Sequence, residues 1–265
     1  MPKQKSFIIK IKGFIKGVSY YFENGEPRQR IPNPPTKDQI YNDPRFAGVR
    51  ANNKEFGGAS TYSKSIATGL KNNIHTFKDS RCTSRLTAAL QKIIKKGRGT
   101  PGKREANILN GPENLMGFQL QKNNVFNQIF TAKYIVSVNE KRTKITIKIP
   151  NITPYNLKNN PSSATHFILT AALSIVSIHN WNSKIKKYEP DYPKVNGLGD
   201  TKKSEPLLCK IEHQNISIQL INPAKTTISG GVAITVWLGI SFGKETDNKF
   251  VPFETAKAME CIAIF

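Results

Sequence analysis

Residues 143–149 read TKITIKI, so that three isoleucines alternate with lysine and threonine. Successive side chains of a β-strand point to opposite faces, and this alternation predicts a strand with one apolar face. Several short strands joined by turns predict an antiparallel, immunoglobulin-like β-sandwich over residues 118–265. The other segments expected to form its strands are 129–138, 166–178, 207–220, 232–242 and, less regularly, 251–265.

Upstream of this region the apolar residues follow a helical period. Residues 83–96 place Leu86, Leu90 and Ile93 on one face of a helix. Gly97 stands where such a helix would stop, and the lysines of the last turn suit the helix dipole. We therefore expect a helix over residues 83–96.

A second amphipathic helix is expected over residues 50–73. Gly57, Gly58 and Gly69 weaken this prediction, because each glycine costs a helix about 1 kcal/mol relative to alanine. The same glycines fit a second interpretation, in which they permit the close approach of another backbone. The expected apolar face holds Phe56, Ala59, Ser63, Ile66 and Leu70.

The N-terminal residues 6–31 predict a β-hairpin, because alternating apolar residues precede the turn-forming pair Asn24-Gly25. Residues 32–48 are rich in proline and asparagine, and residues 97–117 add glycine, so both predict irregular connections. We therefore expect an α+β chain. Its hairpin and two basic helices would occupy residues 1–117, and the sandwich residues 118–265.

The chain is strongly basic. Its 265 residues carry 40 Lys and Arg against 18 Asp and Glu, a formal net charge of +22, while 38% hydrophobic residues still suffice for a core. Residues 1–125 hold 23 basic and 8 acidic residues, and residues 45–104 alone hold 14 and 2. A charge this large opposes compaction and favours a polyanionic partner.

The cations of the two helices and of the segment after them form a candidate nucleic-acid interface. Phosphate neutralisation needs several cations on one rigid surface, and ordinary soluble faces mix both signs of charge. The alternative interpretation is that these residues only keep two amphipathic helices soluble. The twelve candidate residues are Arg50, Lys54, Lys64, Lys71, Arg81, Arg85, Lys92, Lys95, Lys96, Arg98, Lys103 and Arg104.

Residues 97–104, GRGTPGKR, approach the pattern of a phosphate-binding P-loop. However, Arg104 stands where that pattern needs Ser or Thr, and the segment follows a helix instead of a strand. Two other interpretations stay open. The segment is either a flexible basic arm, whose Arg98 and Lys103 reach phosphates, or a solvated linker.

A long insertion, residues 179–203, interleaves Trp181, Tyr188 and Tyr192 with lysines. Aromatic rings among cations can stack the bases of single-stranded nucleic acid. The insertion also fits an ordinary surface loop whose rings pack onto the strands.

We predict no catalytic, metal or cofactor site, and therefore no enzyme. The four histidines lack ligand spacing such as HxxxH, and the sequence has neither GxSxG nor a Cys-His signature. Cys82, Cys209 and Cys261 lie far apart, which fits a reducing, cytoplasmic location better than a disulfide framework. The longest apolar stretch, 164–178, is too short and too polar for a membrane span.

Residues 42–72 carry an Asn-Asp-Pro triplet and an Arg-x-Asn-x-x-Glu-Phe-Gly box ahead of a basic helix. This pattern resembles an uncharacterised family of intracellular proteins from Bacteroidota genomes. The likeness extends to Thr165-His166-Phe167 in the β-rich half, and so covers most of the chain. It departs at Thr61-Tyr62-Ser63, where the family has a small, Lys-rich run. The resemblance implies the architecture and a cytoplasmic location, but no activity, cofactor or catalytic residue.

These observations favour a non-enzymatic protein that binds nucleic acid or another polyanion through phosphate contacts, without sequence specificity. They leave open the identity of the polyanion and the oligomeric state. The alternative is a structural or interaction protein that assembles through its β-sandwich while its basic half docks on an acidic protein partner.

Overall fold

The computed structural model describes residues 11–224, 228–247 and 249–265, and the chain forms two compact units, residues 1–50 and 51–265. The first unit contains a three-stranded antiparallel sheet in chain order. Asn24 and Gly25, between its second and third strands, both have positive φ, at 52° and 81°, as a type I′ turn requires. Within the described residues the predicted hairpin is therefore confirmed. Its strands are β1 (Gly13–Ile15), β2 (Val18–Glu23) and β3 (Glu26–Arg30).

A short helix, α1 (Lys37–Asn42), lies where we expected only an irregular connection, and that expectation is wrong. Thr36 and Gln39 form a capping box, in which each backbone N–H donates to the other residue's side chain. The prolines stand outside the helix, so none removes a helical hydrogen bond. Arg50 then donates to the carbonyl oxygens of Ile40 and Asp43, both at 2.9 Å.

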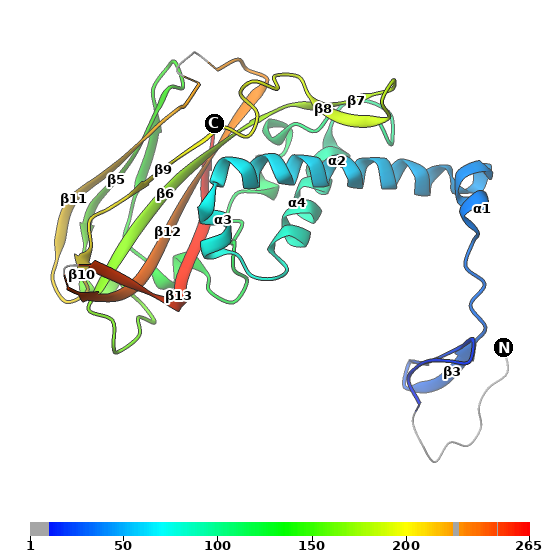
Figure 1. The fold of residues 1–265 in the computed structure, drawn as a ribbon, viewed down its shortest axis with the longest axis horizontal. Coiled ribbons are helices and arrows are strands. Elements are labelled where there is room, and N and C mark those ends of the chain that lie inside the picture. Colours follow the sequence, from blue (N-terminus) through cyan, green and yellow to red (C-terminus); the bar gives the residue numbers. More distant parts are fainter. Residues whose placement is uncertain (1–10, 225–227, 248) are drawn as a thin grey trace. The chain divides into compact units, whose positions relative to one another are not determined.

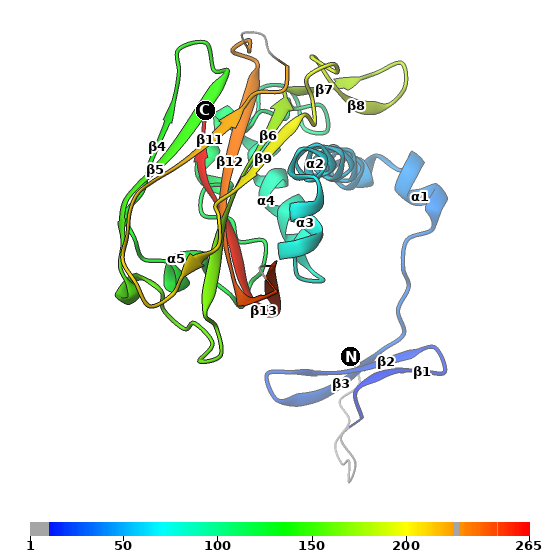
Figure 2. The ribbon, with the colours of Figure 1, turned by 60° about the vertical axis from the view of Figure 1, so that its left-hand side comes forward.

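The second unit has three layers, in which helices cover one face of a five-stranded sheet and a three-stranded sheet covers the other (Figures 1 and 2). All the strand pairs are antiparallel. In the larger sheet the order is β10-β6-β12-β13, with β9 also paired to β6, and in the smaller sheet it is β11-β5-β4. The structure therefore confirms an α+β chain with antiparallel sheets. The strands are β4 (Ile135–Val138), β5 (Lys144–Ile152), β6 (His166–Ser177), β7 (His179–Asn182), β8 (Lys187–Pro190), β9 (Gly199–Lys203), β10 (Leu207–Leu208), β11 (His213–Ile221), β12 (Val232–Thr246) and β13 (Lys249–Ile264).

One hydrophobic core lies between the two sheets. Ile145, Ile147 and Ile149 of β5 are fully buried in it, while Lys144 before them and Lys148 between the last two are exposed. The alternation of TKITIKI is therefore the inward and outward alternation of a strand that is buried on one side. The larger sheet contributes the opposite wall, from every second residue of β6 and β12.

A second core lies between the larger sheet and the helices. Trp237 of β12 is fully buried there, and its indole N–H donates to Thr235 at 3.0 Å. Because β6 and β12 are buried on both faces, their sequences are almost continuously apolar instead of alternating. The helices share this core with the sheet, so the division between compact units falls near residue 50 and not at the predicted boundary of residue 117.

Two of the three helices in this layer correspond to predicted ones: α2 (Ala47–Leu70) and α4 (Cys82–Lys96), while the short α3 (Asn72–Phe77) was not expected. The prediction that Phe56 belongs to the buried face of α2 is wrong. Phe56 is 51% exposed, whereas Glu55 and Tyr62 are buried. The buried positions 55, 59, 62 and 66 follow helical spacing, and Phe56 is displaced from that stripe by one residue.

The segment 97–117 is an irregular connection, as expected, but it is not a solvated linker. Ala106, Ile108 and Leu115 are fully buried against the helical core. Ala106 also exchanges backbone hydrogen bonds with His179, at 2.8 and 3.0 Å. These three apolar side chains therefore fasten the segment to the body of the unit. They are too widely spaced in the sequence to form a periodic pattern.

Several predicted strands have different limits. Residues 129–138 begin with the end of a helical turn, α5 (Phe126–Ile129), before β4. Residues 207–220 are divided between β10 and β11, which belong to different sheets. The irregular segment 251–265 lies in β13, a strand of 16 residues whose pairing with β12 carries two register shifts. These interruptions of the ladder explain why the period-two pattern was weak.

Candidate nucleic-acid interface

The helical half of the second unit has more cations than carboxylates, and each carboxylate already has a partner. Residues 51–125 hold 13 Lys and Arg but only 4 Asp and Glu. Glu55 and Asp79 form ion pairs with Arg104 and Arg85, Glu113 pairs with Lys96, and Glu105 accepts a hydrogen bond from Asn110. The remaining cations therefore meet solvent without local neutralisation.

Five of these cations form what we name the α4 basic stripe: Arg81, Arg85, Lys92, Lys95 and Lys96. At 100° per residue, the four members within α4 fall within an arc of about 100°, and Arg81 is the N-cap residue that precedes them. The apolar side chains of α4 point the other way and are fully buried against the sheet. The amphipathic pattern of α4 thus places the stripe on a rigid surface.

Two members of the stripe are held by the protein itself. The Arg85 guanidinium pairs with Asp79 at 2.8 Å and donates to the carbonyl oxygens of Gln119 (2.8 Å) and Leu120 (3.0 Å). It also lies 5.1 Å from the centre of the Phe118 ring. Lys96 pairs with the exposed Glu113. Arg85 is therefore a structural residue that joins α4 to the 118–120 segment.

The Asp79 carboxylate is the anchor for Arg85. Desolvation acts to raise the pKa of this carboxyl, but the backbone N–H groups of Lys122 and Arg81, with Arg85, together lower it. Both N–H groups donate at 2.8 Å. Asp79 is therefore ionised at neutral pH. Its carboxylate binds the Arg85 guanidinium and two backbone N–H groups, and it does not bind the Arg81 side chain.

The other three members of the stripe are available to a ligand. Arg81, Lys92 and Lys95 are exposed, and within the described part of the chain none of them forms an ion pair. Their side chains can reach a partner at no cost in broken internal contacts.

The predicted cations of α2 are distributed along a long helix and do not form one cluster with each other. Lys54 and Lys71 are separated by 17 residues, which is about 25 Å along a helix axis. The Lys54 ammonium lies 5.1 Å from the centre of the Trp181 ring, a cation–π contact. Lys64 and Lys71 are exposed. Arg50 belongs to the first unit, where it binds two carbonyl oxygens.

The segment 97–104 is a turn docked on α2, and its geometry excludes a P-loop. The Gly102 N–H, which a P-loop would offer to phosphate, donates to the buried Glu55 carboxylate at 2.7 Å. Arg104 lies 3.4 Å from both oxygens of the same carboxylate. Arg98 and Lys103 stay exposed on the turn. A fixed turn with two outward cations thus replaces the flexible arm.

The aromatic residues of the insertion divide between the two interpretations. Tyr188 is buried against Gly58 of α2, and Trp181 packs edge-on against Tyr188 at 5.5 Å. These two rings therefore pack internally, but the expected surface loop is wrong in part, because the insertion forms β7, β8 and β9 and Tyr188 packs on a helix. Tyr192 is different, because 43% of it is exposed.

A buried polar cluster surrounds His179, between α2 and the larger sheet. The His179 ring is fully buried, contacts Tyr62 edge-on at 4.8 Å and lies 3.4 Å from the Ser65 hydroxyl. Its Nδ1 lies 2.9 Å from the Ser177 carbonyl oxygen, which identifies Nδ1 as the protonated nitrogen. Desolvation lowers the pKa of the ring, and Ser177 and Asp191 partly offset this effect. A neutral imidazole without solvent access joins two elements and is not a catalytic base for an external substrate.

The remaining features that bear on function are metal-ligating side chains, cysteines and long apolar helices. No group of three or more His, Cys, Asp and Glu is placed to hold a metal ion in residues 11–224, 228–247 and 249–265. The three cysteines are free and buried, and burial raises the pKa of Cys82 and of Cys209 to about 11. In the same ranges, no helix has the length and apolar character that crossing a membrane requires.

Sequence reasoning missed part of the cationic surface. Lys78 and Lys122 are exposed cations beside the Asp79–Arg85 pair, and neither is among the twelve candidates. Their proximity depends on the fold, because Lys122 reaches Asp79 only through its backbone N–H. No family model, no curated protein and no solved structure matches this chain.

Proposed function

We propose that this protein is a non-enzymatic nucleic-acid-binding protein, which contacts the phosphate backbone without sequence specificity. One observation carries the proposal: in the described part of the chain Arg81, Lys92 and Lys95 form no ion pair at the exposed side of α4, while the acidic residues of that half are engaged internally. Arg98 and Lys103 extend the cationic surface on the turn that follows α4.

The physical basis of binding is the release of counterions. Each cation that neutralises a phosphate frees a condensed counterion, so the affinity falls linearly on a logarithmic scale as salt rises. A rigid helix supports this mode, because its backbone holds the cations at fixed spacings before they bind. Lysines act as point charges and do not read base edges, which is why we propose binding without specificity.

The test is a pair of charge reversals. In Lys92→Glu plus Lys95→Glu, the stripe loses two cations. Lys144→Glu plus Lys148→Glu makes the same change in net charge on the outer face of the smaller sheet, where both lysines are exposed. Binding to labelled DNA and RNA is measured by fluorescence anisotropy at salt concentrations from about 50 to 200 mM.

We expect the stripe variant to bind all sequences more weakly and by similar factors. Its slope of log K against log salt should be less steep by about 1.8, the value for two lost phosphate contacts. The sheet variant should keep most of the wild-type affinity and slope. Equal weakening of both variants, or a wild-type protein that ignores nucleic acid at about 50 mM salt, would remove the proposal.

A second candidate function rests on the smaller sheet. Ile135 and Ile221 are 61% and 56% exposed on its outer face, and β4 pairs only with β5 among the described strands. In this proposal the two sheets act as an immunoglobulin-like sandwich that assembles through its face and edge, and the cations dock an acidic protein. A sedimentation coefficient that rises with protein concentration would favour it, provided that nuclease leaves this rise unchanged and Ile135→Lys abolishes it.

A further inference from the structure

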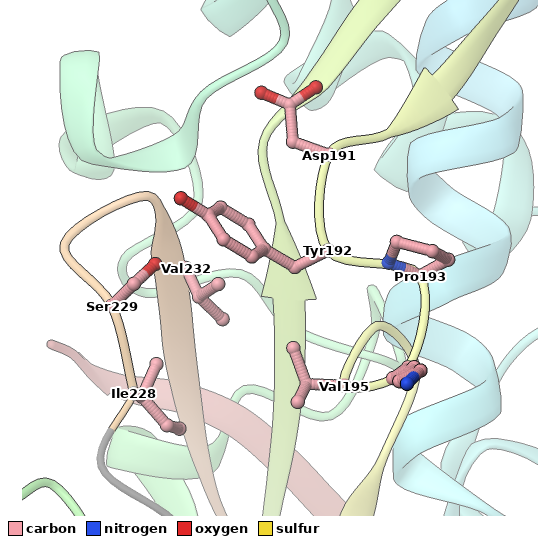
Figure 3. A pocket seen from close by; sticks show the side chains of 8 residues that line it. Asp191, Tyr192, Pro193, Val195, Ile228, Ser229 and Val232 are labelled. Atoms are coloured by element: carbon pink, nitrogen blue, oxygen red, sulfur yellow. The ribbon is translucent and has the colours of Figure 1, made fainter.

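A pocket of about 460 Å³ opens beside the exposed ring of Tyr192. Its walls come from two segments far apart in the sequence, 191–195 after β8 and 228–232 before and at the start of β12 (Figure 3). Its volume falls in the range of roughly 300–1,000 Å³ that is typical of small-molecule sites. The lining residues are Asp191, Tyr192, Pro193, Lys194, Val195, Ile228, Ser229 and Val232.

The lining combines one aromatic ring, aliphatic walls and a few polar groups. Figure 3 shows the Tyr192 ring extending toward the 228–232 segment, where a Cβ added to Gly231 would lie 3.0 Å from the ring. Val195 and Val232 form apolar walls, and Ser229 adds a hydroxyl group. The Asp191 carboxylate accepts hydrogen bonds from Asn180 and points away from the Tyr192 ring (Figure 3). Such a lining suits a flat, partly polar ring, because one part of the site stacks and another forms hydrogen bonds.

The segment that carries Tyr192 is fastened to α2. The Asn196 amide donates to the Ser65 hydroxyl at 2.9 Å, and its oxygen accepts the Ser177 N–H at 3.1 Å. Gly197 packs on the side chain of Thr68, 3.4 Å from the position of a Cβ on residue 197. Asn196 and Gly197, which follow this wall of the pocket, are therefore held against α2 and β6.

This attachment places Thr68 of α2 against Gly197, two residues beyond the pocket wall. Lys64 lies one helical turn before Thr68 on the same face, and Lys71 is the residue that follows the end of the helix. Both are exposed, and Lys194 itself lines the pocket. An aromatic ring with a cation beside it suits single-stranded nucleic acid, in which bases stack and phosphates meet positive charge.

We infer that this pocket accepts an unpaired nucleobase, stacked on Tyr192, while Lys194 and the α2 lysines hold the adjoining phosphates. The inference rests on the proposed function and deepens it, because it names single-stranded nucleic acid as the substrate class. A base inside a duplex is stacked on both faces and cannot enter a pocket. The protein should therefore bind a single strand more tightly than a duplex of the same length.

The experiment compares Tyr192→Ala and Tyr192→Phe with a control, Tyr155→Ala, which removes a tyrosine that is 83% exposed and does not line the pocket. Each variant is titrated with a single strand of about 12 nucleotides and with the matching duplex. Thermal unfolding checks that each variant is folded. Tyr192→Phe keeps the stacking surface and loses only the hydroxyl.

We expect Tyr192→Ala to weaken single-strand binding about ten- to hundredfold, as the loss of one stacked base would, and to leave duplex binding nearly unchanged. Tyr192→Phe and Tyr155→Ala should resemble the wild type. Photo-crosslinking with 5-iodouridine in the strand should label Tyr192. Unchanged single-strand affinity in a folded Tyr192→Ala variant overturns the inference, as does a label placed only elsewhere.

A failure of the proposed function is distinguishable from a failure of this inference. If duplex and single strand bind equally and Tyr192→Ala alters neither, the pocket assignment fails while backbone binding stands. If the wild type binds no oligonucleotide, the proposed function fails, and a titration with cytidine monophosphate followed by NMR examines the pocket alone. Shifts confined to residues 191–195 and 228–232 would support a nucleobase site, and their absence would overturn it.

Discussion

The carbonyl oxygen of Gly69 lies only 1.8 Å from the position that a Cβ on residue 199 would occupy. Gly69 is in the last turn of α2, and Gly199 begins β9, so helix and sheet meet here backbone to backbone. The Leu173 carbonyl oxygen lies 2.7 Å from the same position. The contact requires glycine on both sides, and it fastens the helical layer to the larger sheet.

Gly199→Ala should therefore destabilise the protein. Both nearby atoms belong to the backbone and cannot rotate away, and overpacking of this kind costs about 1–3 kcal/mol. The free energy of unfolding from urea titration, measured by circular dichroism, is the test. Gly230→Ala is the control, because nothing lies within 4 Å of a Cβ there, and its effect should stay within about 0.5 kcal/mol. Similar losses in both variants would contradict the close-contact explanation.

Two adjacent glycines of α2 should respond in opposite directions to alanine. A Cβ on Gly57 meets nothing within 4 Å, so Gly57→Ala should raise the free energy of unfolding by about 0.5–1 kcal/mol through lower backbone entropy in the unfolded chain. A Cβ on Gly58 would lie 2.6 Å from the buried Tyr188 ring, so Gly58→Ala should lower it. Thermal melts of the two variants give the comparison, and equal signs would show that Tyr188 moves aside freely.

Alanine substitutions of two arginines in the α4 basic stripe should have different effects, one on the free energy of unfolding and the other on nucleic-acid binding. Arg85→Ala removes an ion pair and two hydrogen bonds to carbonyl oxygens, so it should cost about 2–4 kcal/mol of unfolding free energy. Arg81→Ala removes only an exposed side chain, so its effect on stability should stay within about 0.5 kcal/mol. Under the proposed function, Arg81→Ala should nevertheless weaken nucleic-acid binding. A stable Arg85→Ala protein would refute the structural role of Arg85.

The stability of the protein should fall as the solution becomes acidic, in part because of His179. Desolvation lowers the pKa of this ring in the folded state below its ordinary value of 6.5. As pH falls below about 6.5, the unfolded chain binds a proton here before the folded protein does, so unfolding is favoured by up to about 1.4 kcal/mol per pH unit. The groups that face the ring are Tyr62, Ser65 and the Ser177 carbonyl, with Asp191 as the nearby charge.

The measurement is the difference in unfolding free energy between about pH 7.5 and about pH 5.5. His179→Gln should reduce this difference, although the variant is less stable at both values. The exposed His75 offers the matched control, and His75→Gln should keep the wild-type difference. An unaltered pH dependence in His179→Gln would show that the buried ring is not the group responsible.

Local pattern was sufficient for some elements and for part of the candidate interface. The alternation of residues 143–149, the apolar stripe of α4 and the Asn24-Gly25 turn each produced the expected structure, because a strand, a helix and a tight turn all repeat over a few neighbouring residues. The same local geometry placed Lys92 and Lys95 on the exposed side of α4.

Pattern did not reveal which cations have partners. Arg85, Lys96 and Arg104 looked equivalent to Lys92 in the sequence, yet each forms an ion pair in the fold. These partners come from other segments, and a carboxylate such as Glu55 gives no local sign that it will be buried.

Composition and short-range periodicity alone determined a basic α+β protein with antiparallel strands, an amphipathic α4 and unusual glycines in α2. The tertiary structure decided that the helices cover a sheet, that Gly69 meets Gly199, and that Tyr192 lines a pocket beside the α2 surface. The physical reason is that side-chain periodicity specifies which faces are apolar, whereas their pairing depends on the steric fit of segments that are distant in the sequence.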